Sequence, residues 1–190
     1  MNIIGLLLAA GSASRFGSDK LRHFLPHGVP IAVQSARHLR PEVTRVVAVV
    51  RDDELKNLLE QEGCQAVVFD NADEGMGASL ACAARAAGRA DGYLVALADM
   101  PFIRRTSIAA VRIALEKGAP LAAPYFRSQR GHPVGISGGF FDALVSLRGD
   151  EGARELLKQN EKQLTKIPVG DPGVIRDIDR PGDLAPPVAV

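Results

Sequence analysis

Short, almost unbroken runs of apolar residues recur along the first 125 positions of the chain. They lie at 3–8, 46–50, 66–69, 93–98 and 121–123, and they are rich in Val, Leu, Ile and Ala. A strand that is buried on both faces lacks polar alternation, and such strands are typical of parallel sheets covered by helices. The pattern therefore predicts five buried strands.

Between these runs, apolar residues follow the period of an α-helix. Gly63 and Gly88 are each placed to end a helix, and Thr106 is placed to cap the start of another. The apolar positions are Leu55, Leu58 and Leu59, then an Ala-rich segment at 76–88, then Ile108, Val111 and Leu115. Alternating strands and helices predict an α/β fold with a doubly wound, mostly parallel sheet. Ligands of such sheets bind beyond the carboxyl ends of the strands.

Composition narrows the class of function. The chain is 46% hydrophobic and 24% charged, and 23 Lys and Arg against 22 Asp and Glu leave a net charge of +1. This near-neutral balance argues against a nucleic-acid-binding protein, which would show an excess of basic residues. The first apolar run is too short for a membrane span and no Lys or Arg precedes it, so we expect no membrane partner. Cys64 and Cys82 form no CxxC pair, which argues against a disulfide scaffold or a cysteine zinc site. We expect a cytoplasmic protein with one domain over 1–185 and a loose tail at 186–190.

A glycine-containing loop follows the first strand directly. Residues 8–20 read LAAGSASRFGSDK, with Arg15 and Lys20 as cations. Small residues let backbone N–H groups approach a phosphate, and two cations suit a polyphosphate. The spacing is neither that of a Walker A loop nor GxGxxG, which argues against a Rossmann redox enzyme. The alternative is a flexible strand-to-helix loop with two solvated cations.

Two segments carry candidate carboxylates. Asp99 ends the strand at 93–98, and Pro101 forces the chain out of the sheet. If residues 177–179 form a strand, Asp177 and Asp179 share one face while Ile178 points into the core. Carboxylates beside a triphosphate are a common way to hold Mg²⁺. From spacing alone, a surface turn is the alternative for each aspartate.

Six blocks together resemble a known family. They are the loop at 8–20 and the segments at 75–80, 98–101, 130–134, 149–154 and 177–183. In this order they resemble nucleotidyltransferases with a Rossmann-like fold. Within these they resemble the molybdenum cofactor cytidylyltransferase (MocA-like) branch of the MobA-like NTP transferase family. The resemblance implies a single three-layer α/β/α domain of the nucleotidyltransferase type.

The resemblance also implies roles for particular residues. The catalytic groups would be Arg15, Lys20 and Asp99, and the metal ligands would be Asp99 and Asp179. The implied nucleotide-binding residues are Leu8, Ala9, Ala10, Gly11, Ser12, Arg15, Lys20, Gly77, Ser79 and Asp99. Ser79 can equally be a first-turn residue of its helix, and Asp177 and Asp183 can be loop or capping carboxylates.

On the acceptor side the resemblance places His132 and Asp150. A lone histidine is more often structural, and Asp150 also fits the cap of a helix that starts at 149–154. These alternatives stay open at the level of the sequence.

The implied reaction moves CMP from CTP to the terminal phosphate of molybdopterin or the molybdenum cofactor and releases pyrophosphate. Mg²⁺ is the expected cofactor, with Mn²⁺ as the alternative ion. The loop starts Leu-Ala-Ala-Gly instead of Leu-Ala-Gly-Gly, which favours CTP over GTP by resemblance. A molybdoenzyme of the xanthine dehydrogenase type is a further expected partner.

Two alternatives remain. One is guanylyl or other nucleotidyl transfer to a different phosphorylated acceptor. The other is a non-catalytic carrier or insertion chaperone for the molybdenum cofactor. The second is motivated by the sequence after Lys20, where Arg22 and His23 depart from the family pattern and are expected to alter how the loop closes over a triphosphate.

Overall fold

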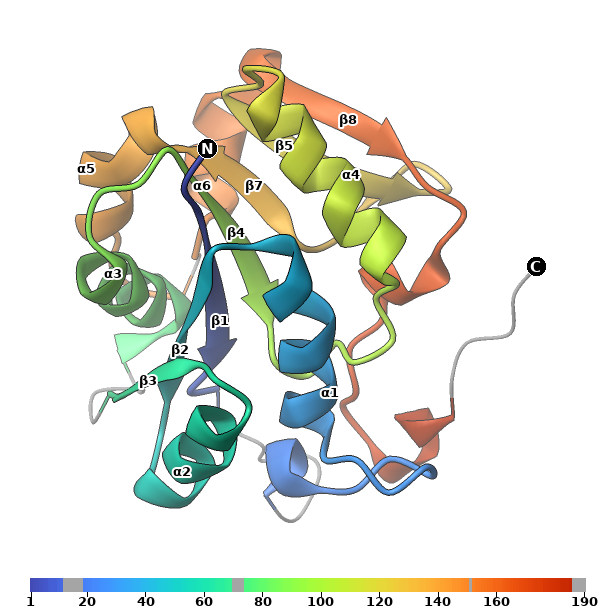
Figure 1. Cartoon of the computed structure of the whole chain (residues 1–190). Helices are drawn as coiled ribbons and strands as arrows, with labels where there is room; N and C mark the ends of the chain where they lie inside the picture. Colours follow the sequence, from blue (N-terminus) through green and yellow to red (C-terminus); the bar gives the residue numbers. More distant parts are fainter. Residues whose placement is uncertain (12–18, 70–73, 151, 186–190) are drawn as a thin grey trace.

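A sheet sandwiched between two layers of helices organises the chain (Figure 1). The computed structural model describes residues 1–11, 19–69, 74–150 and 152–185. The strands are β1 Ile3–Ala9, β2 Arg45–Val50, β3 Gln65–Val68, β4 Gly92–Leu97, β5 Leu121–Phe126, β6 Gln129–Arg130, β7 Val134–Ser137 and β8 Leu164–Pro168. Strands β1 to β5 form at the five apolar runs; β1, β2, β4 and β5 are mostly buried as expected, whereas β3, at the edge of the sheet, is only partly buried.

The sheet is mostly parallel, as the sequence predicts. Its order is β3-β2-β1-β4-β7-β5-β6, and β8 pairs with β5. β1 runs parallel to both β2 and β4, whereas β7 runs antiparallel to β4 and β5. The carboxyl ends of β1 and β4 therefore meet at one edge of the sheet, toward which both arrows point in Figure 1.

Helices cover both faces of the sheet, which confirms the three-layer α/β/α fold. The α-helices are α1 Ile31–Leu39, α2 Asp53–Gln61, α3 Met76–Ala87, α4 Arg105–Glu116, α5 Phe141–Val145 and α6 Arg154–Gln159. α1, α2 and α4 pack on one face, and α3, α5 and α6 pack on the other. Gly63 and Gly88 end α2 and α3 with φ of +78° and +69°, as expected from their positions.

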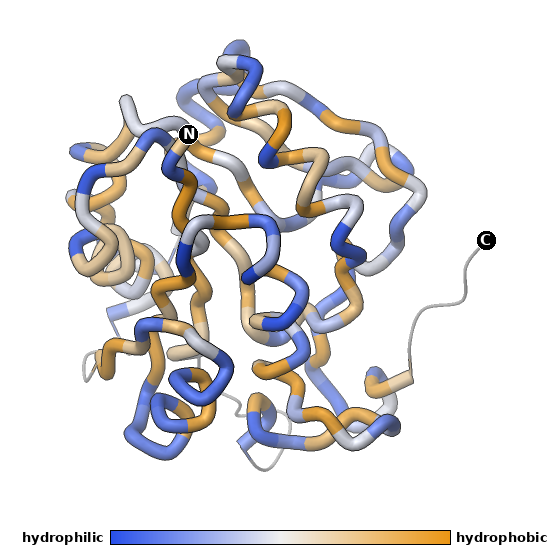
Figure 2. Tube along the Cα trace, viewed as in Figure 1, coloured by the Kyte–Doolittle hydropathy of each residue, from blue (hydrophilic) through white to orange (hydrophobic). Residues whose placement is uncertain are grey.

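β1 shows why the central strands lack polar positions. Ile3 and Leu7 belong to the apolar cluster under α1 and α4, while Ile4, Leu6 and Leu8 belong to the cluster under α3. Each such side chain stabilises the fold by about 1.5–3 kcal/mol on full burial. Apolar residues accordingly fill the middle of the trace in Figure 2 and polar ones lie mainly toward the outside.

Two expected helix caps are wrong. α4 begins at Arg105, so Thr106 lies inside the helix. The buried carboxylate of Asp171 instead accepts hydrogen bonds from the Arg104 amide and the Ser107 hydroxyl, both at 2.8 Å. α6 begins at Arg154, with Ala153 at its N-cap position, so Asp150 does not cap it.

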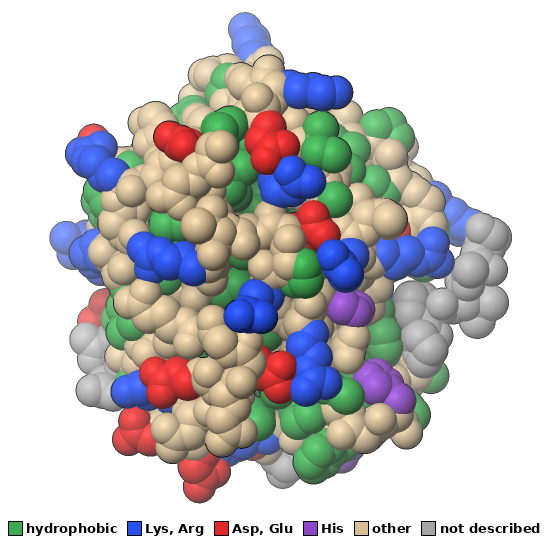
Figure 3. Space-filling model, in the orientation of Figure 1, with side chains coloured by type: hydrophobic (Ala, Val, Ile, Leu, Met, Phe, Trp, Pro, Cys, Tyr) green, Lys and Arg blue, Asp and Glu red, His purple; other side chains and the backbone are tan. Residues whose placement is uncertain are grey.

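The surface and the cysteines agree with the composition. Basic and acidic side chains are interspersed on the face shown in Figure 3. Cys64 and Cys82 are both free thiols. Among the described residues, none of the helices has the length and apolar character needed to cross a bilayer.

Candidate active site

A cleft of about 390 Å³ lies at the sheet edge where β1 and β4 end. Its lining residues are Leu8, Ala9, Ala10, Gly11, Lys20, Leu21, Gly75, Met76, Ser79, Leu97, Asp99 and Asp150. Most of the residues implied for nucleotide binding are among them. Ser12 and Arg15 lie outside the described residues. The cleft thus has the position expected for a ligand of a doubly wound sheet.

The Lys20 side chain, which lines the cleft, forms ion pairs with two carboxylates. Its ammonium Nζ lies 2.9 Å from Asp99 Oδ2 and 3.4 Å from Asp179 Oδ1. Burial of Lys20 opposes its charge, but attraction to Asp99 and Asp179 outweighs burial and raises the pKa of the ammonium. Lys20 therefore carries a full positive charge at neutral pH, in a position where it would also contact phosphate oxygens.

Three carboxylates gather around this lysine. One oxygen from each of Asp99, Asp177 and Asp179 lies within 4.8 Å of the others. Burial, followed by repulsion from Asp99 and Asp179, raises the pKa of Asp177 despite a local backbone hydrogen bond. Carboxylate oxygens are hard ligands, so this donor set fits a divalent cation such as Mg²⁺ or Mn²⁺.

The segment 177–179 is fixed to the end of β4 without forming a strand of its own. The Ile178 amide donates to the Asp99 carbonyl at 2.9 Å, and the Ile178 side chain is fully buried. This anchor places the two flanking aspartates beside Asp99. Asp177 and Asp179 therefore lie on the same side of the segment, as expected, although the segment does not form the expected strand. Asp177 joins the cluster, where the sequence left it open as a loop or capping carboxylate.

Asp183 has a capping role next to the cluster. Its Oδ2 accepts hydrogen bonds from the amides of Asp179 at 3.1 Å and Arg180 at 2.9 Å. The bonds from Arg180 and Asp179 lower the pKa of the Asp183 carboxyl. Asp183 thereby holds the backbone that presents Asp179.

The start of α3 forms another wall of the cleft. Ser79 is buried there, and its hydroxyl donates to the Gly75 carbonyl at 3.3 Å. The Gly77 amide donates to the Gly149 carbonyl at 2.6 Å, so this donor already has a partner. A Cβ on Gly77 would lie 2.6 Å from the Arg148 carbonyl oxygen. Gly77 thus packs α3 against the loop at 148–149, and it is not among the cleft-lining residues.

A second hollow of about 370 Å³ adjoins the cleft, and both implied acceptor residues line it. Asp150 lines the two compartments, and His132 lines the second. Burial lowers the pKa of His132 to about 4 and outweighs the neighbouring Val95 carbonyl. The imidazole is therefore neutral at pH 7. Its Nδ1 is buried and has no hydrogen-bond partner among the described residues.

Arg22 does not line the cleft. Its guanidinium pairs with Asp19, with Glu54 and, at 3.3 Å, with Asp52. Asp52 in turn caps α2 by accepting from the Leu55 amide at 2.9 Å. Arg22 therefore ties the segment after Lys20 to the start of α2.

The fold and the arrangement of this site define a class. A mostly parallel sheet brings a lysine and three carboxylates to the edge beside the residues that end β1. The family model described as "MobA-like NTP transferase domain" matches residues 5–164. The chain belongs to this family and is a nucleotidyltransferase of the MobA-like type.

Two curated relatives match along almost the whole chain. Purine catabolism protein PucB of Bacillus subtilis (strain 168) is 31% identical over 196 residues, covering 94% of this chain and 92% of that protein. Nicotine blue oxidoreductase of Paenarthrobacter nicotinovorans is 28% identical over 188 residues, covering 93% of this chain and 92% of that protein. The two names describe different roles, so relatives of this degree of similarity do not share one function.

Solved structures share the fold. Rv0371c from Mycobacterium tuberculosis H37Rv aligns with a TM-score of 0.79 and 24% identity over 96% of each chain. A manganese complex of the same protein aligns at 0.76 with 23% identity, again over 96% of each chain. A nucleotidyl transferase from Methanothermobacter aligns at 0.79 with 21% identity, over 95% of this chain and 93% of its own.

Proposed function

We propose that this protein transfers CMP from CTP to the terminal phosphate of molybdopterin or the molybdenum cofactor. The observation that carries the proposal is the Lys20 ammonium held between Asp99 and Asp179 at the cleft lined by residues 8–11. CTP is favoured by the Leu-Ala-Ala-Gly start of that loop, which resembles the MocA-like branch. The name of the Bacillus relative belongs to purine catabolism, which suits delivery to a molybdoenzyme of the xanthine dehydrogenase type.

The transfer needs alignment and charge stabilisation more than a protein nucleophile. An oxygen of the acceptor phosphate attacks the α-phosphorus of CTP, and a new O–P bond forms. The bond from the α-phosphorus to the bridging oxygen breaks, and pyrophosphate leaves with that electron pair. A phosphate monoester is largely ionised at pH 7, so no side chain has to remove a proton. This accounts for the lack of a nucleophile–base pair among the described cleft residues.

Each proposed residue has a defined task. Lys20, with Arg15, neutralises charge that builds on the phosphates, and backbone N–H groups at Ala10, Gly11 and Ser12 hold the β and γ phosphates. Ser79 contributes a hydroxyl near the base and ribose, while His132 and Asp150 face the acceptor. Asp99 and Asp179, with Asp177 beside them, would hold Mg²⁺, with Mn²⁺ as the alternative. A bound divalent ion supplies Lewis-acid neutralisation of phosphate charge.

Calorimetry with CTP, GTP and ATP, with and without MgCl₂, tests the nucleotide. We expect CTP to bind selectively and more tightly with Mg²⁺, and Asp99→Asn to remove the Mg²⁺-dependent part. Asp142→Asn is the matched control, because this aspartate is exposed and pairs only with Arg89 among the described residues. Preference for GTP would move the protein to guanylyl transfer. Binding of NADPH with no binding of any triphosphate would instead overturn the transferase proposal.

Pyrophosphate release with CTP and molybdopterin tests the reaction. We expect release that depends on both substrates and on Mg²⁺. Tight binding of molybdopterin without release would support the alternative of a non-catalytic carrier. That alternative is not favoured by the site, because Lys20 and the carboxylates are arranged for phosphate chemistry.

A further inference from the structure

Asp171 is a buried carboxylate with no task in the transfer proposed above. It lies just before the 3-10 helix Pro172–Ile175, it is only 3% exposed, and it does not line the cleft. A carboxylate that leaves water loses its hydration, and it is kept in a fold only where hydrogen-bond donors replace that water. The donors around Asp171 therefore show what its charge does for the molecule.

Three donors surround this carboxylate, and they come from two segments of the chain. The Arg104 amide and the Ser107 hydroxyl donate to Oδ2, both at 2.8 Å, and the Gly173 amide donates to Oδ1 at 2.9 Å. Both donors on Oδ2 belong to the start of α4 or to the residue before it. The carboxylate thus joins the start of α4 to the segment that follows β8, which passes beside that helix in Figure 1.

The two joined segments carry all three carboxylates of the proposed metal site. Asp99 precedes α4, and Asp177 and Asp179 follow Asp171. The same segments are joined a second time at the site itself, where the Ile178 amide donates to the Asp99 carbonyl at 2.9 Å. A segment that is joined at two points has less freedom to slide than one that is joined at a single point.

Tight packing fills the space between the two connections. A Cβ on Gly173 would lie 2.2 Å from the Phe102 carbonyl oxygen. Val174 is fully buried, and its carbonyl accepts from the His132 amide at 2.8 Å. Backbone contacts of this kind cannot rotate away, and a close-packed interior transmits strain. A displacement at Asp171 would therefore be passed along the segment toward the aspartates.

We propose that Asp171 is a positioning residue of the metal site, and that its carboxylate fixes Asp177 and Asp179 relative to Asp99. The inference rests on the metal-dependent transfer proposed above and adds a residue that touches neither the metal nor a substrate. A small divalent cation such as Mg²⁺ demands near-ideal placement of its ligands. Displaced carboxylates cost affinity for the cation even when all three are present.

Asp171→Asn tests the proposal with a side chain of almost the same shape. If the amide oxygen faces Arg104, the NH₂ group faces the Gly173 amide, which is also a donor. In the opposite orientation the NH₂ group faces the Arg104 amide. Either way a buried backbone N–H loses its partner. Ser107→Ala removes one hydrogen bond, leaves both backbone bonds in place and keeps the negative charge of Asp171.

Titration with Mn²⁺ in the absence of nucleotide measures the site without turnover. Electron paramagnetic resonance follows the free ion, and calorimetry gives the Kd. We expect Asp171→Asn to raise the Kd roughly tenfold to a hundredfold, as losses of supporting residues around metal ligands commonly do. Ser107→Ala should raise it by roughly threefold to tenfold, the usual effect of one neutral hydrogen bond.

Tyr93→Phe is the matched control. It also removes a buried hydrogen bond, from the Tyr93 hydroxyl to the Gly88 carbonyl at 2.7 Å, but at the opposite end of β4. We expect it to lower the free energy of unfolding and to leave the Kd for Mn²⁺ unchanged. An equal rise of the Kd in Tyr93→Phe and Asp171→Asn would overturn the proposal, because the effect would then be a general loosening of the fold.

The remaining outcomes also decide. A wild-type Kd in Asp171→Asn would overturn the proposal, because Asp171 would then have a structural role alone. If Asp171→Asn does not fold, a wild-type Kd in Ser107→Ala overturns it instead, and a raised Kd supports it. Wild-type protein that binds no Mn²⁺ would remove the metal site on which the proposal rests. Wild-type protein that binds Mn²⁺ but releases no pyrophosphate would contradict the proposed transfer alone.

Discussion

The ammonium of Lys20 and a divalent cation would compete for the same carboxylates. Lys20 Nζ bridges Asp99 and Asp179, which are also the proposed metal ligands. With a divalent cation held by these carboxylates, the Lys20 ammonium would be available to contact phosphate oxygens in the proposed reaction.

Substituting Lys20→Ala should leave the fold intact and reduce turnover. Removal of a group that stabilises developing charge typically costs about 10²–10³ in rate. The three carboxylates keep contact with solvent, so water can take over their solvation. Steady-state pyrophosphate release measures the effect, with the exposed Lys117→Ala as control. Calorimetry with Mn²⁺ should show binding at least as tight as in wild type, because the competing ammonium is gone. Wild-type turnover would remove Lys20 from the mechanism.

At the scale of elements, the wall of the cleft formed by the start of α3 depends on how α3 packs against the loop at 148–149. Gly77 lies in the first turn of α3, and its amide is bonded to the Gly149 carbonyl. A Cβ at this position would approach two backbone oxygens, those of Arg148 and Gly149, at 2.6 and 2.8 Å. Backbone atoms cannot rotate away, so the two segments would have to separate.

Gly77→Ala should therefore destabilise the protein, although Gly→Ala within a helix usually stabilises by roughly 0.5–1 kcal/mol. We expect the free energy of unfolding to fall by about 1–3 kcal/mol, the usual cost of overpacking. Gly170→Ala is the control, because its Cβ meets nothing within 4 Å. Urea denaturation of both variants measures the difference. A more stable Gly77→Ala protein would show that the contact is looser than the structure indicates.

Elements formed by local pattern are predictable from the sequence, and those formed by distant partners are not. The apolar runs identify β1 to β5, whereas β7 is four residues long and includes Gly135. The start of α4 is held by Asp171, which is 67 residues from Arg104 and accepts hydrogen bonds from the Arg104 amide and the Ser107 hydroxyl. A sequence pattern shows Thr106 near the helix start, but it cannot show that a buried carboxylate from elsewhere binds there.

At the scale of the whole molecule, the parts of the site that depend on contacts between distant residues cannot be predicted from the sequence. The strand-end positions of residues 8–11 and Asp99 are readable from the sequence because they depend on the runs before them. Lys20 and Asp99 are 79 residues apart, and Lys20 and Asp179 are 159 apart, so only the folded chain shows that they meet. The sequence signal for Asp177 is the alternation of a buried Ile178 between two aspartates, which places Asp177 on the same side as Asp179.

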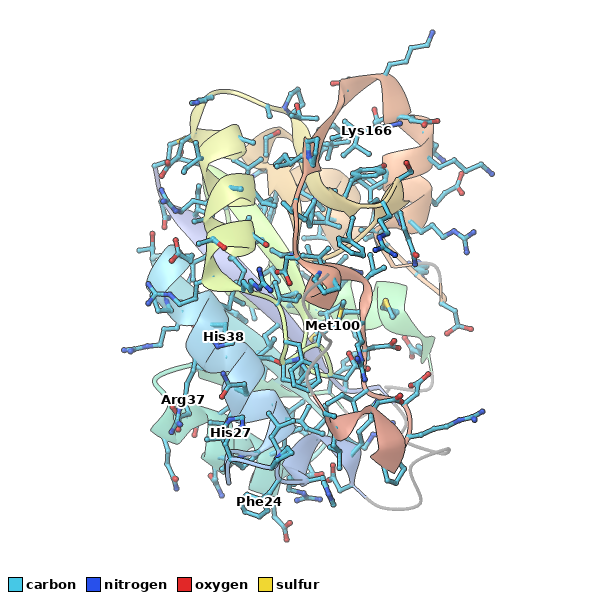
Figure 4. The ribbon with its side chains drawn as sticks, turned by 90° about the vertical axis from the view of Figure 1, so that its right-hand side faces the viewer. Phe24, His27, Arg37, His38, Met100 and Lys166 are labelled. Carbon is cyan, nitrogen blue, oxygen red and sulfur yellow. The ribbon has the colours of Figure 1, made fainter. Side chains whose placement is uncertain are left out.

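A chain of side chains ties the segment after Lys20 to the segment after Asp99. His27 Nε2 lies 3.1 Å from Gln34 Oε1, Gln34 Nε2 lies 2.6 Å from His38 Nε2, and His38 Nδ1 lies 2.8 Å from the Ile103 carbonyl. His27 and His38 are labelled close together in Figure 4. The carbonyl requires a proton on His38 Nδ1, so Nε2 accepts from Gln34 only while the ring is neutral. Burial lowers the pKa of His38, with Arg105 adding to the effect and the Ile103 carbonyl opposing it.

Acid should therefore destabilise the whole fold, because folding lowers the pKa of His132 and of His38. The pKa of His132 falls from 6.5 to about 4 on folding, so below pH 6.5 the unfolded chain binds a proton that the folded chain does not. Stability is fully present above pH 6.5 and is lost progressively down to about pH 4. At pH 5 the loss from His132 is about 2 kcal/mol, because each pH unit within this window is worth about 1.4 kcal/mol. His38 adds a loss of the same sign.

Urea unfolding at pH 7.5 and at pH 5 measures how much of the free energy of unfolding is lost in acid. This loss should be smaller by about 2 kcal/mol in His132→Gln than in wild type or in the exposed His23→Gln control. An equal loss in all three proteins would mean that His132 is not held neutral by the fold.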